Sequence, residues 1–448
     1  MTNARRDGLY LVLMGTAVFL AFGSVLTISS SHPIPDFRFV YNSARCLFQH
    51  IDPYNVSEFQ RVFLAEGGNP GSGSARSQYM EMSQYMYLPT SFVVAPIALL
   101  SWGPAFLIWS ILIAVSFVLA SFLIWQLGAK YSPVISGALI CMTLASSELL
   151  LVVGNPVGIV ISLCVVAVWC FVENRFALAG ITCLAISLML KPHDGGLVWL
   201  YFLLAGGVYR KRAVQTLIMT VALCIPIVLW VTYVSPHWFP ELRSNLAALS
   251  AHGHLNDPGP QSMAGHGIAM VIDLQTMISV FRDDPRVYNS ISYLICGLLL
   301  LVWSVATVRS RPSPASTWLA LAAIAPLSML PVYHRLGDAK LLLLTVPACA
   351  ILWAEGGLLG WLAVAVSSAG VLFTGELQWA MFFGLLKHIR SSANWLNGFL
   401  LVAAQVFPVP LTLLTVGVFY LWIYWKRASE PALNSDAAVL AGTNIKTG

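Results

Sequence analysis

The sequence alternates long apolar runs with polar segments over most of its length. The first run covers about residues 9–30, and about 20 apolar residues are enough for a helix to cross a bilayer. Further runs lie at about 104–127, 133–152, 156–172, 176–190, 194–209, 213–234, 288–308, 315–331, 339–353, 357–374 and 398–425. Two longer polar segments, 31–103 and 235–287, interrupt them. The pattern predicts an all-α polytopic membrane protein with about 12 transmembrane helices.

The basic residues set the predicted orientation of these helices. They gather in short segments between apolar runs, at Arg5/Arg6, Lys130, Arg175, Arg210–Arg212, Arg309/Arg311 and Lys426/Arg427. Basic residues favour the cytoplasmic side of a membrane. The assignment requires that Leu88 to Leu100 lies along the interface, because a crossing there would invert every later loop. We therefore expect a retained first helix, cytoplasmic termini, and external segments at 31–103 and 235–287, the first of them carrying interfacial helices.

The composition agrees with a membrane protein. Of 448 residues, 58% are hydrophobic and 10% are charged, whereas a soluble domain averages about a quarter charged. The net charge of +5 comes from short loops between apolar runs, so no nucleic-acid partner is expected. Most of the eight cysteines lie inside apolar runs without paired or metal-ligand spacing, which is typical of small core residues. We expect a single domain, residues 1–430, followed by a flexible cytoplasmic tail at 431–448.

An acidic residue, Asp36, follows closely after the first predicted transmembrane helix. Asp36 opens a stretch with aromatic, amide and basic residues that ends in an Asp-Pro-Tyr motif. An acidic residue so close to the hydrocarbon is rare in membrane proteins and usually has a function. Asp36 either caps a helix that begins at Phe37 or serves as a catalytic or ligand-binding acid. Tyr41, in the same stretch, is a weaker candidate for contact with a sugar or an acceptor.

A lysine ends an apolar run on the same predicted side. Lys191 is followed at once by Pro192, His193 and Asp194. Its stem can lie along lipid with the ammonium group at the interface, which is snorkelling. Alternatively, Lys191 binds a lipid-borne phosphate, with His193 as a second, weaker contact to phosphate or sugar.

A second basic cluster lies at a later turn between apolar runs, at Tyr333-His334-Arg335. Arg335 can grip a phosphate through two nitrogens, and His334 can donate a hydrogen bond or a proton. Asp338 follows three residues later. The simpler alternative is that Asp338 only neutralises Arg335 at a helix turn.

The second external segment adds several polar residues. His252, His254 and His266 lack the spacing of a helical zinc site such as H-E-x-x-H, so we predict no metal site and no cofactor. Gln261, between them, is a weaker candidate for a sugar or acceptor contact. Elsewhere, Glu148 falls inside a predicted span, where a carboxylate usually needs a partner.

Taken in order, these pieces resemble the polyprenol-phosphate-mannose-dependent mannosyltransferases of glycosyltransferase family 87, in the GT-C class. The matching pieces are Asp36 to Tyr54, Tyr87-Leu88-Pro89 before a short apolar run, Gly154-Asn155 at the end of a run, Lys191-Pro192-His193, and the turn from Tyr333-His334-Arg335 to Asp338. They cover most of the chain up to about residue 350.

The resemblance implies a GT-C-like fold and transfer of a sugar, on the non-cytoplasmic side, from a polyprenyl-phosphate carrier to a lipid or glycan acceptor. It implies that Asp36 is the general base and that basic residues, for which we select Lys191, His334 and Arg335, hold the donor phosphate. One carboxylate with a basic pocket suits an inverting transfer, because a leaving phosphate needs cations rather than a general acid. A glycosidase would need two facing carboxylates.

Two other classes of protein stay open. A transporter or lipid flippase often has internal repeats and polar groups near the middle of the membrane. Here no half-to-half similarity is evident, and the polar groups gather on one side. An inactive assembly or acceptor-presenting protein related to the GT-C class is the third possibility, and Asp36 argues against it.

Overall fold

The computed structural model describes residues 2–29, 36–69, 88–260, 271–310, 313–376, scattered positions between 378 and 404, and 406–429. Throughout this part of the chain the regular secondary structure is helical. The predicted tail at 431–448 lies outside the described residues.

Seven helical stretches are long and apolar enough to cross a membrane. They are α1 (Asn3–Ser29), α6 (Trp102–Gly128), α7 with α8 (Pro133–Leu144 and Leu149–Val153), α12 (Gly207–Val234), α15 (Pro285–Arg309), η1 with α17 (Leu336–Leu344 and Thr345–Glu355), and α21 (Pro408–Ser429). Shorter apolar helices are α9 (Val157–Val172), α10 (Ala177–Leu190), α16 (Pro314–Ser328) and α18 (Gly357–Phe373). The all-helical, polytopic prediction is confirmed, and the number of about 12 spans stays a prediction.

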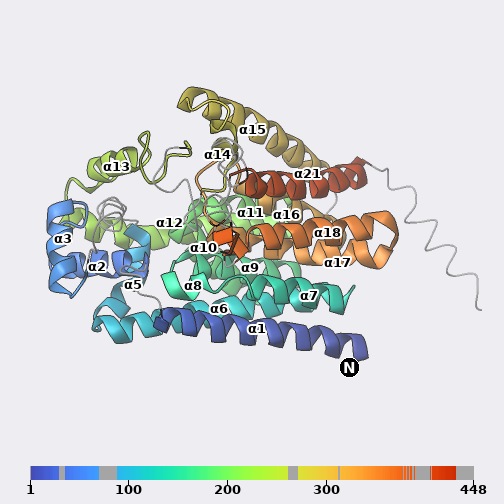
Figure 1. Cartoon of the computed structure of the whole chain (residues 1–448), viewed down its shortest axis with the longest axis horizontal. Coiled ribbons are helices and arrows are strands. Elements are labelled where there is room, and N and C mark those ends of the chain that lie inside the picture. The colour runs from blue at the N-terminus through green and yellow to red at the C-terminus, as the bar shows by residue number, and fades with distance from the viewer. Residues whose placement is uncertain are drawn as a thin grey trace, which may run out of the picture.

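Helices from the two long polar segments lie at one end of the molecule. In Figure 1, α2 (Asp36–Phe48), α3 (Val56–Ala65) and α5 (Leu88–Ala98) share this end with α13 (Trp238–Leu249), and the N-terminus lies at the other end. Helix α5 has 11 residues, or about 16 Å at 1.5 Å per residue. It is therefore too short to cross about 30 Å of hydrocarbon by itself.

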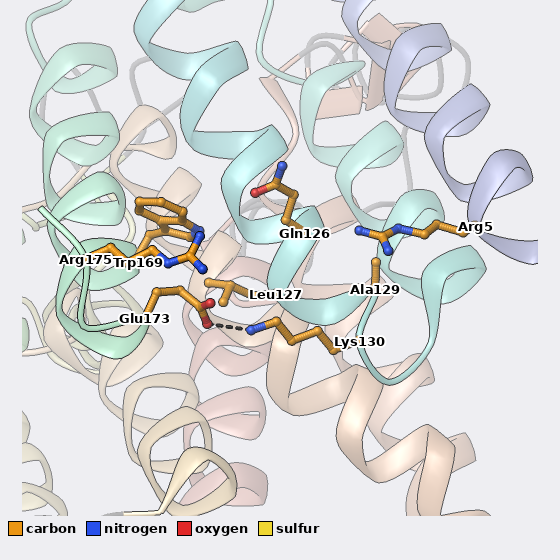
Figure 2. Close-up of a pocket in the computed structure, with 8 residues that line it drawn as sticks. All are labelled: Arg5, Gln126, Leu127, Ala129, Lys130, Trp169, Glu173 and Arg175. Carbon is orange, nitrogen blue, oxygen red and sulfur yellow. Dashed lines mark hydrogen bonds and ion pairs between the residues drawn. The ribbon is translucent and has the colours of Figure 1, made fainter. Parts of the chain in front are cut away.

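The opposite end carries a basic pocket of about 280 Å³, shown in Figure 2. Its lining residues are Arg5, Gln126, Leu127, Ala129, Lys130, Trp169, Glu173 and Arg175. Lys130 Nζ lies 2.6 Å from Glu173 Oε1. Three basic residues from well-separated positions in the sequence therefore meet near the start of α1.

One predicted boundary was wrong. The sequence pattern placed Arg210–Arg212 in a loop, but they lie inside α12, which begins at Gly207. Helix α11 (Pro192–Ala205) ends just before Gly206. Gly206 and Gly207 have φ of 79° and 53°, a left-handed conformation that glycine adopts without strain. The turn is therefore completed before the basic residues, which are free to form the first turns of α12.

Helix α1 packs along α7 through small residues. Gly8, Gly15 and Gly23 lie on its buried face together with Val12 and Phe19. A Cβ atom added at Gly15 would lie 2.7 Å from the Cα of Cys141. Small residues of this kind let two membrane helices approach closely.

We predict that Gly15→Ala lowers the melting temperature of the detergent-solubilised protein, because the new methyl group meets backbone and not a flexible side chain. Overpacking of this kind costs about 1–3 kcal/mol. Gly297→Ala on α15 is the matched control, since a Cβ atom there meets open space. Equal melting temperatures for the two variants would contradict the close α1–α7 contact.

Candidate functional site

Asp36 is held at the beginning of α2 by aromatic packing and one side-chain hydrogen bond. Phe37, the next residue, is fully buried, and its ring stacks on Trp109 of α6 with centroids 4.9 Å apart. Asn155 Nδ2 donates to Asp36 Oδ2 at 2.5 Å. Helix α2 begins at Asp36 itself and not at Phe37, and the Asp36 carboxylate reaches across to a residue far away in sequence.

The turn that carries Asn155 has a defined shape. Gly154 ends α8 with φ of 63°, and a Cβ atom there would lie 3.0 Å from the Cβ of Phe37. Its carbonyl oxygen accepts from Trp109 Nε1 at 2.8 Å. Asn155 Oδ1 accepts from the Val157 amide at 2.9 Å, which leaves the Nδ2 group for Asp36. The amide is therefore oriented by its own backbone before it meets the acid.

The surroundings of Asp36 change its acidity. Burial raises the pKa of the Asp36 carboxyl above its usual value, against the opposing effects of Arg335, the Asn155 hydrogen bond and Lys191. Its side chain is only half-buried, so a proton can still reach it. Asp36 thus combines the two properties of a general base, a raised pKa and access to a ligand.

Lys191 lies at the break between α10 and α11 and contacts two buried acids. Its Nζ is 3.2 Å from Asp194 Oδ2 and also donates to Asp338 Oδ1. Asp194 and Asp338 are 2% and 3% exposed. The snorkelling alternative does not describe this lysine, because its ammonium group turns to carboxylates in the protein and not outward along lipid.

The turn with His334 and Arg335 is fixed by its main chain. The Ile272 amide donates to the His334 carbonyl oxygen at 3.0 Å, and Val271 forms an antiparallel bridge with Arg335. The Arg335 amide donates to Asp338 Oδ2 at 2.8 Å. Asp338 therefore does not simply neutralise the Arg335 side chain, since its two oxygens are used by the Arg335 backbone and by Lys191.

The guanidinium group of Arg335 is positioned through one nitrogen. Its Nε donates to the Tyr333 hydroxyl, and its Cζ lies 5.4 Å from the centre of the Tyr333 ring. Among the residues that the structure describes, the two terminal nitrogens have no hydrogen-bond partner. They are therefore available for an anion such as a phosphate.

The two histidines of the predicted site lie side by side. The rings of His193 and His334 are 4.9 Å apart, and His334 is fully buried. His334 Nδ1 lies 2.8 Å from the Val332 carbonyl oxygen, whereas its Nε2 lies 3.2 Å from Asp194 Oδ1. Burial and the Lys191 ammonium group lower the pKa of His193 to about 4, so this imidazole is neutral at pH 7.

A second group of buried charges lies behind these residues. Lys340 Nζ donates to the Ser146 carbonyl oxygen at 2.8 Å and lies 3.8 Å from Glu376 Oε2. Glu148 is 1% exposed and, within the described residues, its carboxylate has no hydrogen-bond partner. Lys340 is the cation that acts on it electrostatically. The partner expected for a carboxylate in this span is thus a lysine of η1.

One weaker sequence candidate, Tyr41, does not join the site. Tyr41 is fully buried, its ring packs edge-on against Trp102, and its hydroxyl donates to the Leu100 carbonyl oxygen at 2.9 Å. It therefore has no free surface for a sugar, because its side chain belongs to the hydrophobic core of the protein. Gln261 and His266 lie outside the described residues.

Sequence reasoning missed the roles of Asn155, Asp194 and Asp338 as partners of the site. Asp194 had a signal, since it directly follows the Lys-Pro-His run. Asn155 belongs to the Gly154-Asn155 piece of the family resemblance, but the sequence did not predict its contact with Asp36. His252, by contrast, contacts Asp257 Oδ2 at 3.2 Å and Asp283 Oδ2 at 3.6 Å, in a separate cluster.

We predict that Lys191→Met destabilises the protein by about 3–5 kcal/mol, because two buried carboxylates lose their cation. Lys130→Met is the matched control, because its pair with Glu173 is half exposed and such pairs contribute at most about 1 kcal/mol. Unfolding in detergent with increasing denaturant measures both. A Lys191 variant no less stable than the Lys130 variant would contradict the buried ion network.

Comparison with known proteins adds the family. The model of glycosyltransferase family 87 matches residues 85–332, more than half of the chain. No curated protein matches it. The matched range contains Asn155, Lys191 and His193 and ends two residues before His334. The match favours an enzyme over the transporter that the sequence left open. The chain belongs to glycosyltransferase family 87.

Proposed function

We propose that this glycosyltransferase moves a sugar from a polyprenyl-phosphate carrier to a hydroxyl group of a lipid or glycan acceptor, with inversion at the anomeric carbon. Mannose is the sugar to test first, because the sequence resembles mannosyltransferases that use this carrier. The observation that carries the proposal is one half-buried carboxylate, Asp36, within electrostatic range of Arg335 and Lys191.

In the proposed reaction, Asp36 accepts the proton of the acceptor hydroxyl as its oxygen attacks the anomeric carbon. The bond between that carbon and the phosphate oxygen breaks, and its electron pair leaves with the carrier phosphate. Removal of the proton in the transition state makes the hydroxyl a better nucleophile. Asn155 keeps the carboxylate facing the site through its hydrogen bond.

The leaving phosphate gains negative charge, and cations in the site would stabilise it. Arg335 offers two terminal nitrogens in the fork geometry that matches phosphate oxygens. Lys191 supplies a second positive charge, and His334, the neighbour of Arg335 in the chain, is within electrostatic range of Lys191. Fixed charges placed where charge develops account for much of the catalysis in such sites.

The other acids near Asp36 support a single-carboxylate mechanism. Asp194 and Asp338 are occupied by Lys191, and Glu376 is in contact with Lys340. A retaining reaction would need a second free carboxylate close to the anomeric carbon. Inversion by one base is therefore the mechanism that we propose.

The orientation in the membrane follows from charge. Arg5, Lys130 and Arg175 line one pocket at the end where α1 begins (Figure 2). Because basic residues favour the cytoplasmic side, we place this end in the cytoplasm with both termini. Asp36 and the segments 31–103 and 235–287 then face the external, periplasmic side of the cell membrane.

We predict that Asp36→Asn lowers the rate of sugar transfer by about 10²- to 10⁴-fold, which is the usual contribution of a general base. The assay uses membranes supplied with radiolabelled polyprenyl-phosphate mannose, and extracted lipids are analysed for product. Glu58→Gln in α3 is the control, because it removes a carboxylate from the same segment. Full transfer by Asp36→Asn would exclude this residue as the base.

We also predict how transfer depends on pH. Because the pKa of Asp36 is raised, transfer should decline with acidification at a pH above that of an ordinary aspartate. Asn155→Ala removes a hydrogen bond that favours the ionised carboxylate, so the acidic limb of the kcat/KM profile should move to higher pH. A profile that keeps its position, with only a lower plateau, would contradict this effect of Asn155.

A further inference from the structure

A carboxylate oxygen and two imidazole nitrogens converge beside the proposed phosphate contacts. His334 Nε2 lies 3.2 Å and His193 Nε2 lies 3.9 Å from the same oxygen, Asp194 Oδ1. One ligand atom from each of these three residues lies within 4.8 Å of the other two. A divalent ion with bonds of about 2.0–2.2 Å in tetrahedral geometry would hold its ligands about 3.4 Å apart, so small side-chain shifts would close the site.

Hydrogen bonding leaves the ligand atoms free. Both Nε2 atoms are buried, and neither has a hydrogen-bond partner in the described part of the chain. Nδ1 of His334 faces the Val332 carbonyl oxygen at 2.8 Å. A metal-binding histidine typically donates its other ring nitrogen to a carbonyl oxygen in this way, which fixes the ring and leaves Nε2 for the ion.

The two oxygens of Asp194 have different neighbours. Oδ2 faces the Lys191 ammonium group at 3.2 Å, whereas Oδ1 faces the imidazoles. The carboxylate is thus anchored on one side and open on the other. A metal-binding carboxylate is commonly oriented by such an outer contact.

Charge also favours a cation at this place. Three carboxylates, those of Asp36, Asp194 and Asp338, meet two permanent cations, Lys191 and Arg335. These five groups together carry one excess negative charge, with the imidazoles left out of the count. An imidazole lone pair and a carboxylate oxygen that face each other repel unless a proton or a metal ion lies between them.

We propose that His193, Asp194 and His334 bind a divalent transition-metal ion, of which zinc is the best match. Two nitrogens and one oxygen suit zinc and its neighbours, whereas calcium and magnesium prefer oxygen ligands. Three protein ligands leave a coordination position open. The spacing rule missed this site because its ligands come from two segments that are far apart in the sequence.

The role of the ion rests on the proposed function. Its open position would bind a phosphate oxygen of the donor, next to Lys191, and its charge would stabilise the leaving phosphate. The net charge of the group would then change from −1 to +1, which suits an anionic ligand. The presence of the ion can be tested without any donor or acceptor.

The experiment measures zinc binding by the full-length protein in detergent. The protein is stripped with a chelator, loaded with zinc, desalted and analysed by mass spectrometry of the metal. We expect one equivalent for the wild type. His334→Ala and His193→Ala should each raise the Kd for zinc by more than about 100-fold in competition with a coloured chelator, since even outer-shell changes cost 10- to 100-fold.

His237→Ala is the matched control, because His237 is exposed at the beginning of α13 and should leave zinc binding unchanged. His193 is half-buried, so its replacement keeps the test valid if the buried His334 variant fails to fold. Cobalt provides a second readout, since four-coordinate Co²⁺ with protein ligands absorbs visible light far more strongly than the aqueous ion.

The proposal would be overturned if the wild type bound no zinc, or if the His193 and His334 variants bound zinc as tightly as the wild type. A proton on His334 would then occupy the place of the ion. These outcomes are separate from the transfer assay: if zinc binds but the wild type transfers no sugar from a polyprenyl-phosphate donor, the metal site is supported and the proposed function fails.

Discussion

The contact of Lys191 with Asp194 and Asp338 is the interaction on which the site depends. It joins the break between α10 and α11 to the beginning of η1, across 147 residues of sequence. Buried carboxylates without a cation are strongly destabilising, so this one ammonium group decides whether the two segments can meet. Because Asp338 also accepts from the Arg335 amide, the same contact places the arginine that we assign to the donor phosphate.

The acid of the site is positioned by different means. Asp36 does not pair directly with a lysine. Its place comes from Phe37 packed on Trp109 and from the amide of Asn155. A hydrogen bond from a neutral amide holds the carboxylate without lowering its pKa as far as a close cation would. The base can then keep its affinity for a proton while the phosphate contacts lie nearby.

Much of this could be predicted from the sequence, because polar residues at the ends of apolar runs are conspicuous. Asp36, Lys191, His334 and Arg335 were selected in this way, and the structure brings them together. The partners of these residues were harder to predict from the sequence. Contacts such as that of Asn155 with Asp36 depend on which helix ends lie side by side, and the hydropathy pattern does not specify this. Tyr41 was misplaced because the apolar pattern of a short helix does not say which of its aromatic residues face the core.

If the proposed function holds, binding of the donor phosphate would be coupled to binding of a cation. Asp273, whose pKa burial raises to about 6, adds a further carboxylate near His334. A donor phosphate therefore enters a group that is already neutral or negative, and its affinity would be poor unless positive charge arrived as well. His334 Nε2 is the atom at which either a proton or a metal ion would supply it. The orientation of this one buried imidazole, set by the Val332 carbonyl oxygen, thus links the structural ion network to the proposed chemistry.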